Sequence, residues 1–256
     1  DHDTREVRIA VAANPSTFGQ TITLTATVSG QGGTPSGSAE FRDGATLVGT
    51  AALDENGAAT LDVSDLAVGD HPITAVYPGD AVFAGSTSAA LTQTVDRAAT
   101  ATVVTSSANP STLGQTVTLH AVVSRTNPGP GTPGGSVEFF DGTTSLGTAV
   151  IDVTGAAELD VSPTVGSHPI TALYAGDVSF GGSTSGVLDQ VVVAAPLSPT
   201  TTELTSGPNP TTVGEQVVLT AQVDAEAGTP GGTVEFREGT TILGAVTVDG
   251  TGAAVL

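Results

Sequence analysis

The chain is organised by one stretch, Asn14-Pro15-Ser16-Thr17-Phe18-Gly19-Gln20, which returns as Asn109-Pro110-Ser111-Thr112-Leu113-Gly114-Gln115 and again as Asn209-Pro210-Thr211-Thr212-Val213-Gly214-Glu215. Three phenylalanines recur with it, 98 and 97 residues apart, at Phe41, Phe139 and Phe236. A period of this length is too long for a solenoid repeat and suits a whole small domain. We therefore predict three domains, at residues 1–97, 98–195 and 196–256.

Strict alternation of apolar and polar residues follows the motif in each copy. The apolar positions are Ile22, Leu24, Ala26 and Val28 in the first copy, Val117, Leu119, Ala121 and Val123 in the second, and Val217, Leu219, Ala221 and Val223 in the third. A period of two with many β-branched residues predicts a strand with one buried face. Turn signals such as Asp43-Gly44 and Asn56-Gly57 separate further strands of the same kind. We predict about seven strands per unit, in two antiparallel sheets packed face to face.

Composition excludes several classes of protein. Asp and Glu outnumber Lys and Arg by 26 to 6, and the net charge of −20 is spread over all three units. This charge argues against nucleic acid as a partner. There is no Cys for a disulfide and no Lys for a Walker A loop or a Schiff base. The longest apolar run, residues 191–195, is too short to span a membrane, so no membrane insertion is expected.

Longer motifs carry a resemblance to a known family. The Asn-Pro-Ser-Thr-x-Gly-Gln stretch is followed by Gly-Thr-Pro-x-Gly and then by His-Pro-Ile-Thr-Ala-x-Tyr-x-Gly-Asp-x-x-Phe-x-x-Ser-Thr-Ser, which begins at His71 and at His168. This order resembles the bacterial Ig-like repeats of the group-3 type over essentially the whole chain. The resemblance implies an all-β fold of tandem immunoglobulin-like β-sandwiches. Such repeats serve as spacers and adhesive modules in bacterial surface proteins and in phage virions.

The third unit matches the other two only in part. Leu256 aligns with Leu61 and Leu159, so the region equivalent to the Tyr and Gly-Asp segment is not reached. We expect the sequence to be a segment of a longer chain. The alternative is completion of this unit by a strand from another molecule.

Acidic residues supply the only candidate metal ligands. Asp80 and Asp177 recur in the Tyr-x-Gly-Asp segment, and Asp96 lies at the first junction beside Arg97. A short carboxylate after a glycine turn commonly accepts backbone amides and fixes the loop. The alternative is calcium, which needs several converging oxygens, and no second carboxylate adjoins Asp80 or Asp177. We predict loop capping, no cofactor, and calcium only as the alternative reading.

No set of residues indicates catalysis. The histidines His2, His71, His120 and His168 do not occur at metal-ligand spacing, and no Ser-His-Asp set has a sequence pattern behind it. The stretch from Gly129 to Gly134 fits GxGxxG, but it leads into a strand and contains two prolines, so we interpret it as a loop. We predict that the chain is not an enzyme.

Three residues are candidates for surface contacts. Phe140 occupies an outward position of its strand, where the other units have Arg42 and Arg237. Arg125 and Asn127 belong to a Pro/Gly loop over residues 125–133, which is three residues longer than its counterparts. A loop of this kind is a common place for a ligand contact.

The resemblance sets the functional expectation. It implies a structural or adhesive segment, a tandem Ig-like stalk or spacer of a larger bacterial surface or phage virion protein. The junctions support it, because only 16 and 19 residues separate Gln93 from Asn109 and Gln190 from Asn209. The alternatives are a carbohydrate- or protein-binding module and accessory domains of a secreted hydrolase. We expect an extracellular or cell-surface location, or exposure on a virion. The expected partners are other domains of the same chain, with a surface glycan or protein as a further one.

Overall fold

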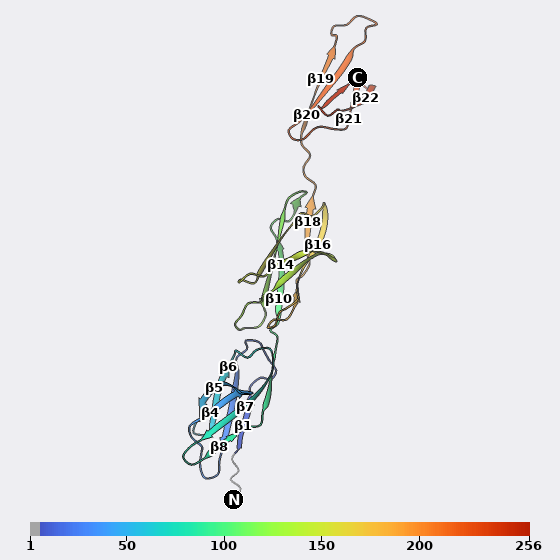
Figure 1. Ribbon diagram of the computed structural model, residues 1–256. Helices are drawn as coiled ribbons and strands as arrows, with labels where there is room; N and C mark the ends of the chain where they lie inside the picture. Colours follow the sequence, from blue (N-terminus) through green and yellow to red (C-terminus); the bar gives the residue numbers. More distant parts are fainter. Residues whose placement is uncertain (1–5) are drawn as a thin grey trace. The chain divides into compact units, whose positions relative to one another are not determined.

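The computed structural model describes residues 6–256, and every regular element in this range is a β-strand (Figure 1). His2 lies outside the described residues. The chain divides into two compact units, residues 1–194 and 195–256. The first unit contains two sandwiches, which we call domain one and domain two, and the second unit is described separately below.

Domain one is built from nine strands in two sheets. The strands are β1 (Glu6–Val11), β2 (Ser16–Thr17), β3 (Ile22–Ser29), β4 (Ser38–Asp43), β5 (Thr46–Ala52), β6 (Ala58–Val63), β7 (Gly69–Gly79), β8 (Ala84–Thr87) and β9 (Leu91–Asp96). One sheet has the order β1-β3-β6, and the other has the order β2-β9-β7-β4-β5 with β8 paired to β7. This is the predicted immunoglobulin-like sandwich.

Domain two repeats domain one strand by strand. Its elements are β10 (Thr100–Ser106), β11 (Ser111–Thr112), β12 (Val117–Arg125), β13 (Ser136–Asp141), β14 (Thr144–Val150), β15 (Ala156–Val161), β16 (Gly166–Tyr174), β17 (Ser183–Thr184) and β18 (Leu188–Val193). The sheets are β10-β12-β15 and β11-β18-β16-β13-β14, with β17 paired to β16. Both domains exceed the predicted strand count, because the first strand is divided in two and a short strand follows the Gly-Asp turn.

Alternation along each strand produces the two cores. The largest fully buried side chains occupy equivalent positions, and they are Leu24, Phe41, Ile73 and Tyr77 in domain one and Leu119, Phe139, Ile170 and Tyr174 in domain two. Burying side chains of this size contributes about 1.5–3 kcal/mol each. Since neither core contains a cysteine, aliphatic and aromatic packing holds the sheets together.

The repeated Asn-Pro motif carries the chain from one sheet to the other. β1 pairs antiparallel with β3, whereas β2 pairs parallel with β9 in the opposite sheet. Between them the Asn14–Pro15 bond is cis. The Asn14 side chain donates to the Thr92 carbonyl at 2.7 Å and accepts from the Thr94 amide at 3.0 Å. The Asn14 amide group therefore makes the two hydrogen bonds to β9 that the backbone of a neighbouring strand residue would make.

The second unit has five strands in two small sheets. They are β19 (Thr200–Gly207), β20 (Val218–Ala225), β21 (Thr233–Glu238), β22 (Thr241–Thr247) and β23 (Ala253–Val255), ordered β19-β20-β23 and β21-β22. Its core is correspondingly small, with Ala221, Phe236, Val248 and Ala254 buried. Within the described chain β21 pairs only with β22, whereas β4 and β13 also pair with β7 and β16.

Candidate functional site

The short connection between domain one and domain two, residues 97–99, is held by backbone hydrogen bonds to domain two. Three residues separate the end of β9 from the start of β10, and the middle one, Ala98, is completely buried. Its amide donates to the Ser179 carbonyl at 3.0 Å, and its carbonyl accepts from the Gly181 amide at 2.9 Å. The connection is thus incorporated into domain two as a bridge to Phe180.

Aromatic contact adds to this junction. Phe18, in the loop after β2, meets Phe180 of domain two edge to face, with ring centroids 5.7 Å apart and planes at 78°. The Phe18 amide donates to the Asp96 carbonyl at 2.8 Å, which holds the loop against the end of β9. Such aromatic pairs contribute about 0.5–1.5 kcal/mol beyond the area they bury.

Arg125 lies at the centre of the junction. Its guanidinium donates to the Asn127 carbonyl at 2.6 Å, to the Pro128 carbonyl at 3.1 Å and to the Pro130 carbonyl. A further N–H donates to the Phe18 carbonyl of domain one at 3.0 Å. The same group lies over the Phe180 ring, 5.9 Å from its centroid. The structure therefore places this predicted contact residue within the junction, and its loop faces domain one.

Asn127 lies in the same loop and lines a groove between the two domains. The groove has a volume of about 620 Å³, and domain one and the loop at 127–130 both contribute to it. Its polar lining comes from hydroxyl and amide side chains, which belong to Thr17, Gln20, Thr21, Ser64 and Asn127. The groove and the Arg125 contacts belong to a single site.

A second recurring arrangement joins a histidine to a carboxylate. His168 Nδ1 lies 2.7 Å from Asp141 Oδ2, and its Nε2 lies 2.9 Å from the Thr164 carbonyl. His71 makes the same pair of contacts with Asp43 and with the Ala67 carbonyl. Both ring nitrogens therefore face acceptors, which suits the protonated ring.

The electrostatics of these histidines follow from their contacts. The Asp141 carboxylate and then the Thr164 carbonyl raise the pKa of His168 above its ordinary value, against the effect of burial. Burial alone would lower the pKa of His71. The hydrogen bonds to Asp43 and Ala67 and the charges of Asp43 and Asp70 outweigh burial, so the pKa of His71 is raised.

The His168 geometry opposes a role as general base. Ser162 lines the same small hollow as His168 and Asp141. A serine would have to transfer its proton to Nε2, but Nε2 already faces the Thr164 carbonyl. The three residue types of a catalytic triad are therefore neighbours without the arrangement that the chemistry requires.

The candidate calcium ligands Asp80 and Asp177 lie in the turns after β7 and β16. Asp80 accepts from the amides of Val82, Phe83 and Ser36 and from the Ser36 hydroxyl, at 2.6–2.9 Å. These amides hold the pKa of Asp80 well below its usual range. A calcium ion would have to displace these donors.

Asp177 accepts from three amides, those of Gly134, Ser179 and Phe180. Burial alone would raise the pKa of Asp177, but these amides outweigh it and lower it. Asp96 is exposed at the end of β9. Among residues 6–256 no group of three or more His, Cys, Asp or Glu is placed to hold a metal ion.

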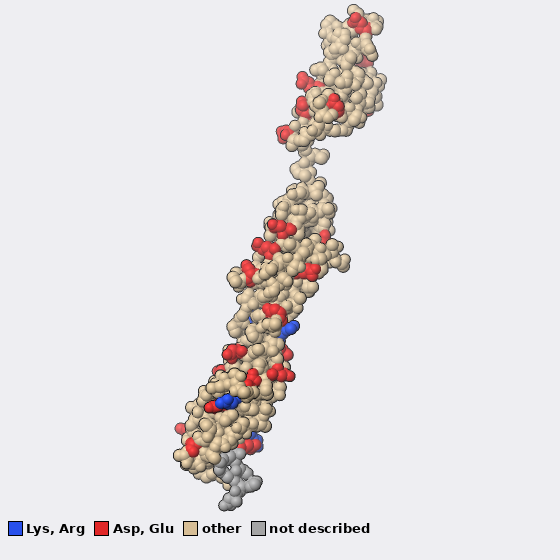
Figure 2. Space-filling view, viewed as in Figure 1, with Lys and Arg blue, Asp and Glu red and all other residues tan. Residues whose placement is uncertain are grey.

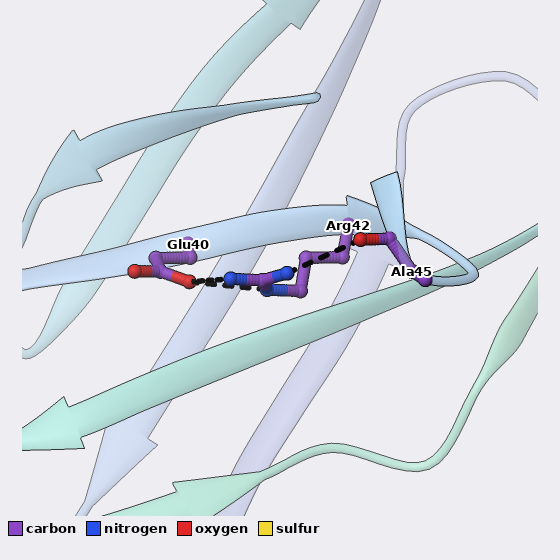
Figure 3. Close-up of polar contacts among 3 residues, drawn as sticks. All are labelled: Glu40, Arg42 and Ala45. Carbon is purple, nitrogen blue, oxygen red and sulfur yellow. Dashed lines mark hydrogen bonds and ion pairs between the residues drawn. The ribbon is translucent and has the colours of Figure 1, made fainter. Parts of the chain in front are cut away.

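Phe140 is half-buried on β13, next to the bulge at Phe139. The equivalent Arg42 on β4 lies along its strand and donates to the Glu40 carboxylate at 2.7 Å and to the Ala45 carbonyl at 3.3 Å (Figure 3). Arg237 makes the same kind of ion pair with Glu235. Domain two thus presents an aromatic ring where the other copies have an ion pair.

Charged groups are distributed without a concentrated patch on the face shown in Figure 2, where carboxylates are scattered and cations are few. In the part of the chain that the structure describes, no helix is present that is long and apolar enough to cross a membrane.

Sequence reasoning missed Phe18 and Phe180 as junction residues. Phe18 occupies the variable position of the repeated motif, where the other copies have Leu113 and Val213. An aromatic residue at an otherwise aliphatic turn position was the available signal. The carbonyl acceptors of Arg125 left no signal, because every residue has a carbonyl.

Comparisons with known proteins show what the chain is similar to. Among solved structures it is similar to fibronectin(III)-like modules of Clostridium thermocellum CbhA, with 20% identity over 73% of this chain and 94% of that chain, and a TM-score of 0.33. It is also similar to the ectodomain (Ig1–Ig3) of mouse nectin-like molecule 4, with 16% identity over 74% of this chain and 65% of that chain, and a TM-score of 0.31.

A search of curated protein sequences finds no match. The family model described as bacterial Ig-like domain (group 3) matches residues 9–96, 104–193 and 204–256, which is most of the chain. The chain belongs to the group-3 bacterial Ig-like domain family, with three matched regions in tandem.

Proposed function

We propose that this chain is a non-enzymatic spacer, a tandem Ig-like stalk segment of a larger bacterial surface or phage virion protein. Its role is to hold other parts of the same protein at a distance from the surface that carries it. The observation that carries the proposal is the direct junction between domain one and domain two.

The junction supports a spacer for a mechanical reason. A flexible linker lets neighbouring domains fold back on one another, and its reach grows only with the square root of its length. Here Ala98 is buried in domain two and Phe18 packs on Phe180, so consecutive domains share contacts. An array of this kind extends by a fixed length with each added domain.

The charge supports the same role. With 26 acidic residues against 6 basic ones, copies of the chain on one surface repel each other over about 10 Å at moderate salt. This repulsion keeps neighbouring copies separate and soluble. It is also consistent with an exposed, extracellular location.

A display experiment tests the spacer role. The chain is placed between a membrane anchor and a fluorescent reporter, and the height of the reporter above the membrane is measured by interference microscopy. Deleting residues 98–194 should lower the reporter by one domain length. Replacing them with a Gly/Ser linker of equal residue number should instead widen the spread of reporter heights, because such a linker has no fixed length. An unchanged height after the deletion would contradict a spacer role.

The interdomain groove favours a second function, a carbohydrate-binding module. Its volume of about 620 Å³ and its hydroxyl and amide lining suit a short sugar chain. Binding of the full chain to a glycan array, lost when residues 127–130 are replaced by Gly/Ser, would support this function in place of the spacer. Absence of glycan binding would remove it.

A further inference from the structure

The position of Arg125 differs among the three copies of the fold. Its counterparts after the motif are Gly30 in the first copy and Ala225 in the third, so the guanidinium is particular to domain two. The loop that follows it contains Pro128 and Pro130, which lack amide hydrogens and restrict their own backbone. A loop with few amide donors and several carbonyls directed inward requires a donor from elsewhere.

The guanidinium supplies that donor. It has five N–H groups in a rigid plane. Three carbonyls of its own loop, those of Asn127, Pro128 and Pro130, accept from it and are brought together around it. The fourth acceptor, the Phe18 carbonyl, comes from domain one. The loop is therefore ordered by contacts within domain two, and the guanidinium directs a fourth N–H to the preceding domain.

We propose that this end of domain two is a socket for the β2–β3 loop of the preceding Ig-like domain, and that the Arg125 guanidinium is the built-in cation that locks the two domains in one orientation. The socket takes an apolar side chain against Phe180 and a free backbone carbonyl on the guanidinium. Phe18 provides both. The lock is independent of whether the chain acts as a spacer or binds a glycan.

Domain one shows what this end of the fold is like without the arginine. Its Phe83 is the counterpart of Phe180, and it lies directly over Gly30, where a Cβ would be only 2.6 Å from the ring. Phe83 therefore covers the position that Arg125 occupies in domain two. In domain two the Phe180 ring instead contacts Phe18, and a Cβ on Gly131 would meet both rings. With the arginine at this position, Phe180 packs in the core of its own domain and also receives Phe18 from the preceding one.

The β2–β3 loop that enters the socket has a counterpart in domain two. Leu113 occupies the position of Phe18 in domain two, and its side chain is 51% exposed. Its loop has the same geometry, with the Thr112 amide donating to Gln115 as the Thr17 amide donates to Gln20. The partner that fits the socket is thus a loop of the Asn-Pro-Ser-Thr-apolar-Gly type with its carbonyl unpaired.

Distance measurements on the full chain test the lock. Since the chain has no cysteine, Glu55→Cys in domain one and Val153→Cys in domain two introduce two exposed sites for spin labels. Pulsed electron resonance then gives the distribution of label distances. We expect a narrow distribution in the parent and a distribution at least about twofold wider in Arg125→Ala and in Phe18→Ala, as for domains joined by a flexible linker.

Matched controls separate the lock from general damage. Arg42→Ala removes an arginine that pairs with Glu40 on the outer face of β4, and it should leave the distribution unchanged. Millimolar guanidinium should narrow the distribution again in Arg125→Ala but not in Phe18→Ala, because only the first variant lacks the cation. Thermal melting confirms that each variant retains both sandwiches. A distribution in Arg125→Ala as narrow as in the parent, or equal broadening in Arg42→Ala, would overturn the proposal.

Discussion

At the scale of single residues, polar side chains in this chain mainly form hydrogen bonds with the backbone of loops. Asp80 and Asp177 accept hydrogen bonds from backbone amides of the turns that follow them. Asp43 and Asp141 anchor a histidine each. The sequence indicated the acidic positions, because they recur with the repeat. It did not indicate the donors, most of which are backbone amides.

The histidine contacts predict a pH dependence of stability. The folded pKa of His168 is raised above the ordinary 6.5, so its contribution is fully present below that value and is lost as pH rises through the raised pKa. We expect the difference in free energy of unfolding between the parent chain and His168→Gln to shrink as pH increases from about 5 to about 9. Urea unfolding at a series of pH values measures it. A difference that grows with pH would contradict the assignment.

At the scale of the strands, much of the fold was predictable. Alternation and Asp-Gly turns give β3, β4, β5 and β6 nearly residue by residue, because each has one buried face and a defined hairpin. The short strands β2 and β8 were not predicted, since two to four residues carry too little alternation. The junction was not predictable either, because it depends on backbone carbonyls and on Phe18 finding a partner more than 150 residues away, at Phe180.

The Asn-Pro motif gives an element-scale prediction. Asn109 donates to the Asp189 carbonyl at 2.7 Å and accepts from the Val191 amide at 3.0 Å, which fixes the chain beside β18 just ahead of β11. Asn109→Ala should lower the free energy of unfolding of domain two by about 1–2 kcal/mol, since both hydrogen bonds are lost. Chemical denaturation measures the change. Asn127→Ala is the control, because Arg125 uses only its backbone carbonyl, and an equal loss in this variant would speak against the role of Asn109.

At the scale of the whole molecule, domain one and domain two are separate cores that share a junction. The buried residues of the two clusters do not overlap, and Phe18 is the side chain of domain one that packs against the cluster of domain two. Each sandwich therefore has the apolar interior it needs to fold as a unit. Contacts at the junction orient the two domains, while their hydrophobic cores remain separate. Both properties suit the spacer role that we propose.

Single-molecule force spectroscopy on the full chain tests this account most directly. The matched regions of domain one and domain two have roughly 90 residues each and should each release about 30 nm of chain on unfolding, in two separate events of equal size. Phe41→Ala should weaken one of these events and Phe139→Ala the other, because each removes a buried core side chain worth about 3–5 kcal/mol. One event that releases both domains together, weakened equally by either substitution, would contradict the account.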